Sequence, residues 1–219
     1  MKNSKKIAVA ILACMAISVA SSKAITLNYY GLAGIYFNGT GGFTFTSTNG
    51  YQFQIQSVTG GSGDSVGLDG YISASQPFMI GTITTNAPGY ETAPVSGSGT
   101  LYITDQNSDN LSGTIQWDNI TTLYTSGVLD LTGTINLTGI TYSGSNSDLM
   151  ALAAPDQASD TVSFQFDPAV PLSQLVTSVN ETSYSGSIYA VPVPEPGTWT
   201  LMGAGLVSLL SLKRFLKRQ

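Results

Sequence analysis

Alternation of apolar and polar residues runs through the middle of the chain and restricts it to β-structure. Clear examples are residues 43–46, 51–56, 101–104 and 162–166, in which Phe, Tyr, Ile, Leu and Val alternate with Thr, Gln and Ser. A period of two places one side of each strand on a core and the other in water. Turn-forming pairs such as Asn38-Gly39, Asn49-Gly50 and Asp69-Gly70 separate these runs. The pattern predicts many short antiparallel strands over residues 25–190.

A short phrase of the type Ser/Thr-Gly-Ser/Thr followed by an apolar residue recurs at residues 98–101, 112–115, 132–135 and 185–188. The intervals are irregular, which excludes a solenoid of fixed period. We interpret the phrase as a common way of starting a strand, with Gly at a bend. The predicted fold class is all-β, an antiparallel β-sandwich, with a β-barrel or jelly roll as the alternative. Only residues 171–177 are predicted to form a short helix.

Charge is distributed unevenly along the chain. All 8 basic residues lie near the two ends, and all 13 acidic residues lie between Asp64 and Glu195. The stretch 24–212 therefore contains no Lys or Arg and no internal salt bridge. Because phosphate binding needs basic side chains, nucleic acid is excluded as a partner. The single cysteine, Cys14, lies near the N-terminus and histidine is absent, which excludes thiol nucleophiles, Ser-His-Asp triads and His-based zinc sites in the domain.

The N-terminal segment has the layout of a secretory signal peptide. Three lysines in residues 2–6 precede an apolar run over residues 7–20, and Ser22 and Ala24 are small residues at the exit. We predict a signal peptide over residues 1–24, cleaved between Ala24 and Ile25 by signal peptidase. An uncleaved anchor, or a lipoprotein signal using Cys14, are the alternatives.

The C-terminal segment, residues 191–219, has three parts in order. Pro194-Glu195-Pro196 comes first and an apolar stretch over residues 198–212 follows, which as a helix would reach about 22 Å. A basic cluster ends the chain: Lys213, Arg214, Lys217 and Arg218. We predict a short transmembrane helix whose basic end is retained in the cytoplasm.

These three parts resemble the PEP-CTERM sorting signal of Gram-negative bacteria. The resemblance implies recognition by exosortase, a membrane-embedded cysteine transpeptidase, with Pro194, Glu195 and Pro196 as the sorting motif. It further implies transient anchoring in the inner membrane, transfer to the cell surface or extracellular matrix, and a setting of exopolysaccharide and biofilm production. An ordinary C-terminal anchor is the alternative. The resemblance carries no information on the fold of residues 25–190.

One loop of the central region has the residue types of a calcium site. Asp105, Asn107 and Asp109 place oxygen-bearing side chains at every second position. An EF-hand loop would need Gly and Glu where Asn110 and Gln116 stand, so only a loop between two strands could serve. The alternative is a hairpin turn in which Asp and Asn side chains bond to the backbone. Otherwise no cofactor is expected.

Two further sets of residues could serve carbohydrate chemistry. Paired carboxylates of a glycosidase could come from Glu91, Glu181, Asp118 and Asp130, although their spacing singles out no pair. A sugar-stacking platform could come from Trp117, Tyr102, Tyr124 and Tyr142, although aromatic residues of β-domains more often form the core.

The sequence thus predicts an exported, non-catalytic protein of the cell surface or matrix. Its central domain would be a structural or adhesive component of an extracellular polysaccharide matrix. The alternatives are a secreted carbohydrate-active enzyme using Asp or Glu, and a calcium-dependent carbohydrate-binding module. Expected partners are signal peptidase and exosortase during processing, the inner membrane transiently, and extracellular polysaccharide.

Overall fold

The computed structural model describes residues 23–87, 90–125, 128–166 and 170–191. These residues belong to one compact unit, Lys23–Pro192. Its strands are β1 Ile25–Gly31, β2 Ile35–Asn38, β3 Gly42–Phe45, β4 Phe53–Thr59, β5 Asp69–Ser73, β6 Phe78–Ile80, β7 Thr84–Ala87, β8 Tyr90–Ser96, β9 Ser98–Thr104, β10 Asn110–Thr125, β11 Val128–Thr141, β12 Gln157–Phe166, β13 Val179–Thr182 and β14 Tyr184–Ala190. Two short helices, α2 Ser147–Ala153 and α3 Leu172–Leu175, complete the described part.

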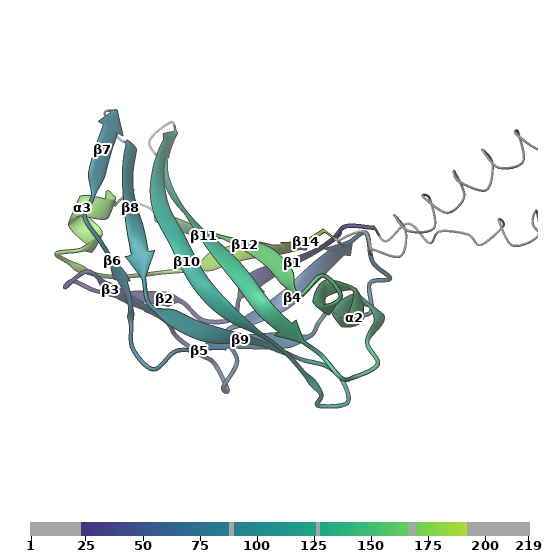
Figure 1. Ribbon diagram of the computed structural model, residues 1–219. Coiled ribbons are helices and arrows are strands. Elements are labelled where there is room, and N and C mark those ends of the chain that lie inside the picture. Colours follow the sequence, from purple (N-terminus) through teal and green to yellow (C-terminus); the bar gives the residue numbers. More distant parts are fainter. Residues whose placement is uncertain (1–22, 88–89, 126–127, 167–169, 192–219) are drawn as a thin grey trace, which may run out of the picture. The chain divides into compact units, whose positions relative to one another are not determined.

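Eight strands close into an antiparallel barrel in the order β10, β11, β12, β14, β1, β4, β5, β9 and back to β10 (Figure 1). Every neighbouring pair in this ring is antiparallel. The predicted all-β class and antiparallel pairing are therefore confirmed. The preference for a sandwich was wrong and the barrel alternative is right, because β10 and β11 pair with each other as well as with their outer neighbours and leave this sheet no free edge.

A second sheet continues from the far half of β10. The pairing of β10 with β9 ends at Gln116, and residues 119–121 then pair with β8, while the ladder with β11 continues past a register shift between Trp117 and Asn119. From β8 the sheet continues through β6, β3 and β2 to β13, with β7 attached to β8. The long strand β10 therefore belongs to both parts and joins them, as Figure 1 shows.

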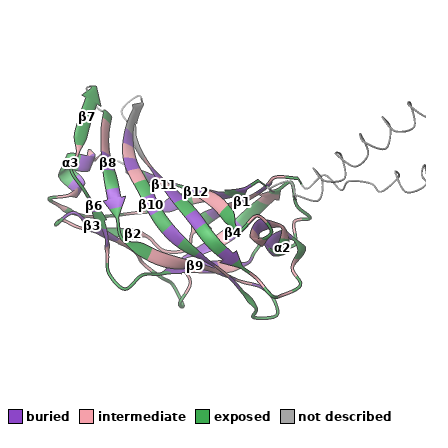
Figure 2. Ribbon diagram, in the orientation of Figure 1, coloured by how far each residue is buried: buried purple, intermediate pink, exposed green. Residues whose placement is uncertain are grey.

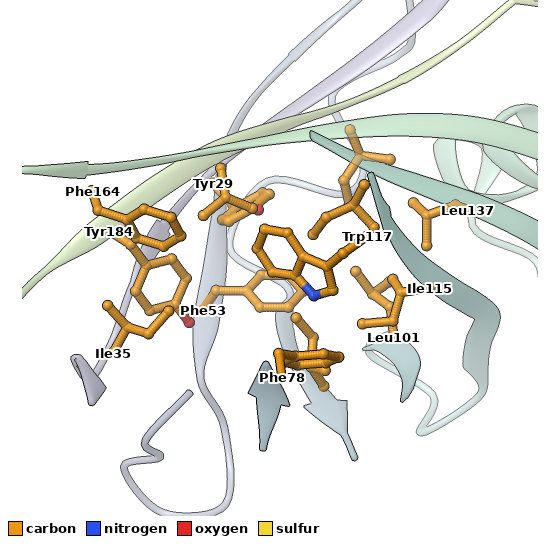
Figure 3. Packing of buried hydrophobic residues seen from close by; sticks show 14 of the residues in the cluster. Tyr29, Ile35, Phe53, Phe78, Leu101, Ile115, Trp117, Leu137, Phe164 and Tyr184 are labelled. Atoms are coloured by element: carbon orange, nitrogen blue, oxygen red, sulfur yellow. The ribbon is translucent and has the colours of Figure 1, made fainter. Parts of the chain in front are cut away.

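The core fills the barrel and extends under the second sheet. Buried and exposed residues alternate along the barrel strands, which Figure 2 shows as alternating colours. Trp117 packs against Phe43 with a centroid separation of 5.1 Å and against Phe78 at 5.6 Å, and Figure 3 shows it among the aromatic and aliphatic side chains of the core. Burying each such side chain stabilises the fold by about 2 kcal/mol. Because residues 24–212 contain no Lys or Arg, this apolar burial stabilises the domain without help from ion pairs.

Glycine in the recurrent phrase has a role different from the one predicted. Gly186 lies under the ring of Tyr29 and Gly133 under the indole of Trp117, and a Cβ at either position would overlap that ring. Gly70, outside the phrase, lies in the same way under Phe53, its partner across β4 and β5. The copy at residues 98–101 does begin a strand, β9, whereas the other three copies lie inside β10, β11 and β14. At Gly133 and Gly186 the phrase supplies a position without a side chain, so that a large ring from a neighbouring strand can lie across it.

Of the local elements, one predicted turn and one predicted helix are confirmed, and a second helix was not predicted. The Asn49-Gly50 turn is confirmed: both residues have positive φ, 54° and 87°, and Thr48 pairs with Tyr51 across them. The helix expected at residues 171–177 is present as α3. Helix α2 was missed, although Asn146 caps it by accepting hydrogen bonds from the N–H groups of Asp148 and Leu149.

Candidate functional site

Asp105 begins the turn between β9 and β10 and is held inside it. One carboxylate oxygen, Oδ1, accepts the N–H groups of Asn107 at 2.8 Å and Asp109 at 2.9 Å. The other, Oδ2, accepts the hydroxyl of Tyr142 at 2.5 Å. This arrangement is the backbone-capping turn considered as the alternative to a metal loop. The Tyr142 hydroxyl, aided by the two N–H groups and opposed by burial, lowers the pKa of Asp105.

The calcium site at Asp105, Asn107 and Asp109 stays a prediction. Both oxygens of Asp105 already accept hydrogen bonds, whereas Asn107 and Asp109 are exposed. Within the described ranges, no group of three or more His, Cys, Asp or Glu side chains could hold a metal ion. A calcium ion at this loop would therefore have to draw on backbone, amide and hydroxyl oxygens as well.

A polar pocket of about 260 Å³ lies beside this turn. It is lined by Asp64, Asp105, Gln106, Asn107, Ser145 and Asn146. Hydrogen bonds from the hydroxyl groups of Ser147 and Ser62 lower the pKa of Asp64. Because the pKa of each of the two carboxyl groups in the pocket is lowered, both are ionised at neutral pH and neither is suited to donate a proton as a general acid.

Another carboxylate, Asp148 in α2, is enclosed by the loop after β4. Its oxygens accept the N–H groups of Ser62 at 2.6 Å, Gly63 at 3.0 Å and Ser65 at 3.0 Å, and also the hydroxyl of Ser62 at 2.9 Å. Gly61 lies directly against the carboxylate, so that a side chain at that position would overlap it. Asp148 therefore fixes the Gly-rich loop to the helix, and its oxygens are fully used in doing so.

One carboxylate, Asp160 of β12, lies inside the barrel. It is completely buried, and its side chain has a single hydrogen-bonding partner among the described residues, the hydroxyl of Tyr29, at 3.0 Å from each oxygen. Burial raises the pKa of Asp160 to about 7, although the Tyr29 hydrogen bond opposes the shift. Burial, and then the nearby Asp160, raise the pKa of Tyr184 and of Tyr29. Asp160 is enclosed by the core and lines neither the Asp64–Asp105 pocket nor the one described below.

The other carboxylates considered for catalysis are dispersed. Glu91 of β8 accepts the N–H of Ser173 in α3 at 2.9 Å. Asp118 is exposed and accepts the amide of Asn119, while Glu181 lies exposed in β13. The side chain of Asp130 lies outside the described residues. Those that are described lie on separate elements and line neither pocket.

The four aromatic residues considered as a sugar platform do not form one. Trp117 is buried in the core and Tyr142 is bound to Asp105. The side chain of Tyr124 lies outside the described residues. Only Tyr102 lies on the outer face of the barrel, where its ring stacks on Tyr71 of β5 with centroids 4.8 Å apart and an angle of 17°. Tyr71 was missed because nothing in its local sequence separates it from other outward Tyr residues.

A second pocket, of about 330 Å³, lies beside Tyr71. It is lined by Thr44, Phe45, Gln52, Tyr71, Ile72, Ser73, Ala74, Gln76 and Phe78. It opens where β4 and β5 separate after the Phe53–Gly70 pair. There the side-chain amide of Gln52 replaces the backbone pairing of β4 with β5. Its oxygen accepts the N–H of Ile72 at 2.6 Å, and its nitrogen donates to the carbonyl of Ile72 at 3.2 Å. We call this cavity the Tyr71 pocket.

The predicted targeting segments fall largely outside the described residues. These segments comprise the signal peptide up to residue 22, the motif Pro194-Glu195-Pro196, the apolar stretch and the basic residues Lys213, Arg214, Lys217 and Arg218. Ala24 and Ile25 are described: Ala24 immediately precedes β1, and Ile25 is its first residue and is buried. Among the helices that the structure describes, none has the length and apolarity needed to span a membrane.

Comparisons with known proteins inform on one end of the chain. Neither the curated proteins nor the solved structures contain a match to this chain. A family model does match at residues 192–214, within the segment where the resemblance to a sorting signal was found. These residues carry the PEP-CTERM protein-sorting motif, which marks this chain as an exported protein processed by exosortase and sorted to the cell surface.

Proposed function

We propose that the barrel is a non-catalytic structural or adhesive component of an extracellular polysaccharide matrix, in which it contacts polysaccharide directly. The observation that carries the proposal is the outer face of the barrel. It is built from hydroxyl and amide side chains in cross-strand rows, such as Ser187, Asn28 and Ser57 on β14, β1 and β4. The hydroxyl of Ser187 donates to Asn28 at 2.6 Å, and the amide of Asn28 donates to Ser57 at 3.0 Å. Such groups match the hydroxyl groups of sugars as donors and acceptors.

The distribution of carboxylates supports a non-catalytic role over the enzymatic alternative. Asp148 and Asp160 are occupied by internal hydrogen bonds, and the Asp64–Asp105 pair combines two carboxyl groups of lowered pKa. Hydrolysis of a glycosidic bond needs one carboxyl group that holds its proton near neutral pH beside one that does not. The described pockets hold no such pair.

Incubation with exopolysaccharide tests the proposal. The full chain, purified in a non-ionic detergent, is mixed with exopolysaccharide from the bacterium that produces it. We expect the protein to co-sediment with the polymer while the number of reducing ends stays constant. New reducing ends would show turnover and favour the enzyme, and failure to co-sediment would overturn the adhesive role.

The route to the matrix forms part of the same proposal. Signal peptidase cleaves after Ala24, the C-terminal helix holds the chain in the inner membrane of a Gram-negative cell, and exosortase then releases it. Replacing Pro194, Glu195 and Pro196 by Ala should leave the uncleaved chain in the inner membrane. Mass spectrometry of the membrane and released fractions measures this, and release with unchanged mass would contradict the proposed route.

A further inference from the structure

Apart from Gln52, the polar side chains that line the Tyr71 pocket are not used in internal hydrogen bonds. Thr44, Ser73, Gln76 and the Tyr71 hydroxyl make no side-chain hydrogen bond within the described part of the chain. In the Asp64–Asp105 pocket, by contrast, Asp64, Asp105 and Asn146 all bond to other residues. The Tyr71 pocket thus offers free donors and acceptors to a ligand.

The ring of Tyr71 is supported on one face by a second aromatic ring. Tyr102 lies against one face of it, nearly parallel, and does not line the pocket. Because Tyr71 lines the pocket and Tyr102 does not, the face of Tyr71 opposite Tyr102 is the one available to a ligand there. Phe45 and Phe78 add apolar surface to the same lining and are themselves fixed by contacts with Trp117. A rigid aromatic face next to hydroxyl and amide groups suits a ligand with an apolar face and polar edges.

Charge and size narrow the ligand class further. None of the residues that line the pocket is charged, and no base exists anywhere between residues 24 and 212. An acidic sugar would therefore find no counter-charge and would be repelled by the net negative domain. The volume of about 330 Å³ lies at the lower end of ligand pockets in proteins, which span ~300–1,000 Å³.

From these observations we infer that the Tyr71 pocket binds a short stretch of a neutral glycan, with a sugar ring stacked on Tyr71 and hydroxyl groups bonded to Thr44, Ser73 and Gln76. This inference rests on the proposed function, because it assigns the polysaccharide contact to one site and one chemical class. The amide of Gln52 has a separate part: its bonds to Ile72 hold β5 at the distance from β4 that keeps the pocket open.

Binding of oligosaccharides to defined variants tests the inference. The full chain in non-ionic detergent is titrated with hexasaccharides of glucose, mannose, galactose and xylose, and with an oligogalacturonate as the acidic counterpart. We expect at least one neutral hexasaccharide to bind and the oligogalacturonate to bind more weakly. Tyr71→Ala should weaken binding about tenfold, because it removes the stacking face. Tyr71→Phe should retain most of the affinity.

Two further variants separate local loss of contact from loss of fold. Gln76 is exposed in the loop after β5, so Gln76→Ala should weaken binding while the melting temperature stays unchanged. Tyr189 is a 44% exposed tyrosine on β14, outside the pocket, and Tyr189→Ala should bind as the wild type does. Neutral glycan binding that survives both Tyr71→Ala and Gln76→Ala would overturn the site and leave the proposed function standing. Preference for the oligogalacturonate would overturn the neutral class, and binding to no glycan would overturn both site and function.

Discussion

The junction around Asp148 and the barrel interior around Asp160 bury the same chemical group in two different ways. Both carboxylates are almost wholly buried, at 1% and 0% exposed. Asp148 accepts three backbone N–H groups and one hydroxyl from the loop after β4, whereas Asp160 has one tyrosine hydroxyl. Neither has a basic residue to pair with, since this part of the chain contains none.

The difference shows which hydrogen-bond donors can serve a buried carboxylate in a domain that has no Lys or Arg. Where a loop can wrap around the carboxylate, as residues 62–65 do around Asp148, backbone N–H groups provide the hydrogen-bond donors. Where the neighbours are barrel strands, their N–H groups are already used in the sheet and only a side chain can donate. Asp160 therefore carries a pKa raised to about 7 and keeps its proton in mildly acidic solution.

The largest expected effect is on the pH dependence of stability. The pKa of Asp160 rises from 3.8 to about 7 on folding, so this residue favours the folded state fully below pH 3.8 and ceases to do so as the pH rises through 7. The loss between pH 4 and 8 should be on the order of 4 kcal/mol. The lowered pKa values of Asp64 and Asp105 act oppositely, since their contribution is lost as the pH falls below 3.8. Stability should therefore be highest near pH 4.

Urea unfolding of the full chain in detergent, followed by near-ultraviolet circular dichroism from pH 3 to 8, measures this profile. In Asp160→Asn the residue no longer titrates, so the decline between pH 4 and 8 should flatten. A flat wild-type profile over that range, or an equally steep one in Asp160→Asn, would remove Asp160 as its cause.

The next largest effect on stability concerns Asp148. Asp148→Ala removes the acceptor of the N–H groups of Ser62, Gly63 and Ser65 and should lower the free energy of unfolding by on the order of 3 kcal/mol. Asp118→Ala, which removes the same charge from an exposed position, should change it by less than about 0.5 kcal/mol. Equal effects of the two substitutions in the same urea titration would mean that charge, and not the enclosed carboxylate, is what matters.

The smallest of the three effects concerns the contact between Tyr29 and Asp160 inside the barrel. Gly186→Ala places a methyl group against the ring of Tyr29 and should destabilise the fold by about 2 kcal/mol, because the ring is displaced from Asp160. Gly113→Ala is the matched control: its Cβ would lie 3.3 Å from Ile140 and needs only a small adjustment. If Tyr29 is indeed the donor to Asp160, the pH dependence should also steepen in Gly186→Ala. A change in Gly186→Ala no larger than in Gly113→Ala would show that the Tyr29 ring can be displaced freely.

The fold class followed from the sequence, and closure of the sheet did not. Residues 162–166 alternate as a half-buried strand does, and Asn49-Gly50 correctly predicted the turn between Thr48 and Tyr51. Closure depends on pairings such as Ile25 with Ala190, between segments at opposite ends of the domain that carry no local signal for each other. The glycines at 133 and 186 did carry a signal, but their role depends on which ring crosses them, and that is set by the register of neighbouring strands.

The candidate site was predicted even less completely. Asp160 could have been found, because it shares its strand face with Val162, Phe164 and Phe166 and therefore had to point inward. The Tyr71 pocket could not, since it joins residues 44–45, 52, 71–74, 76 and 78 at a point where β4 and β5 diverge. The divergence of two strands is a property of the assembled sheet and leaves no local signal in the sequence. The sorting motif lies in one continuous segment, so its residues could be recognised from the sequence alone.

The pairing of β1 with β14 affects when this protein is able to fold. The barrel strand that lies furthest along the chain is also the one that joins the first strand to β12, with Ile25 opposite Ala190 and Tyr189 opposite Ser159. Such long-range pairing is slow, because the entropy of closing a long loop is lost before the contacts form. A chain exported with its N-terminus first delivers β14 after every other barrel strand and immediately before the sorting motif. We therefore expect the barrel to stay open during translocation and to close as the sorting motif reaches the membrane. The chain can then cross the membrane in an unfolded state, and no closed barrel has to unfold first.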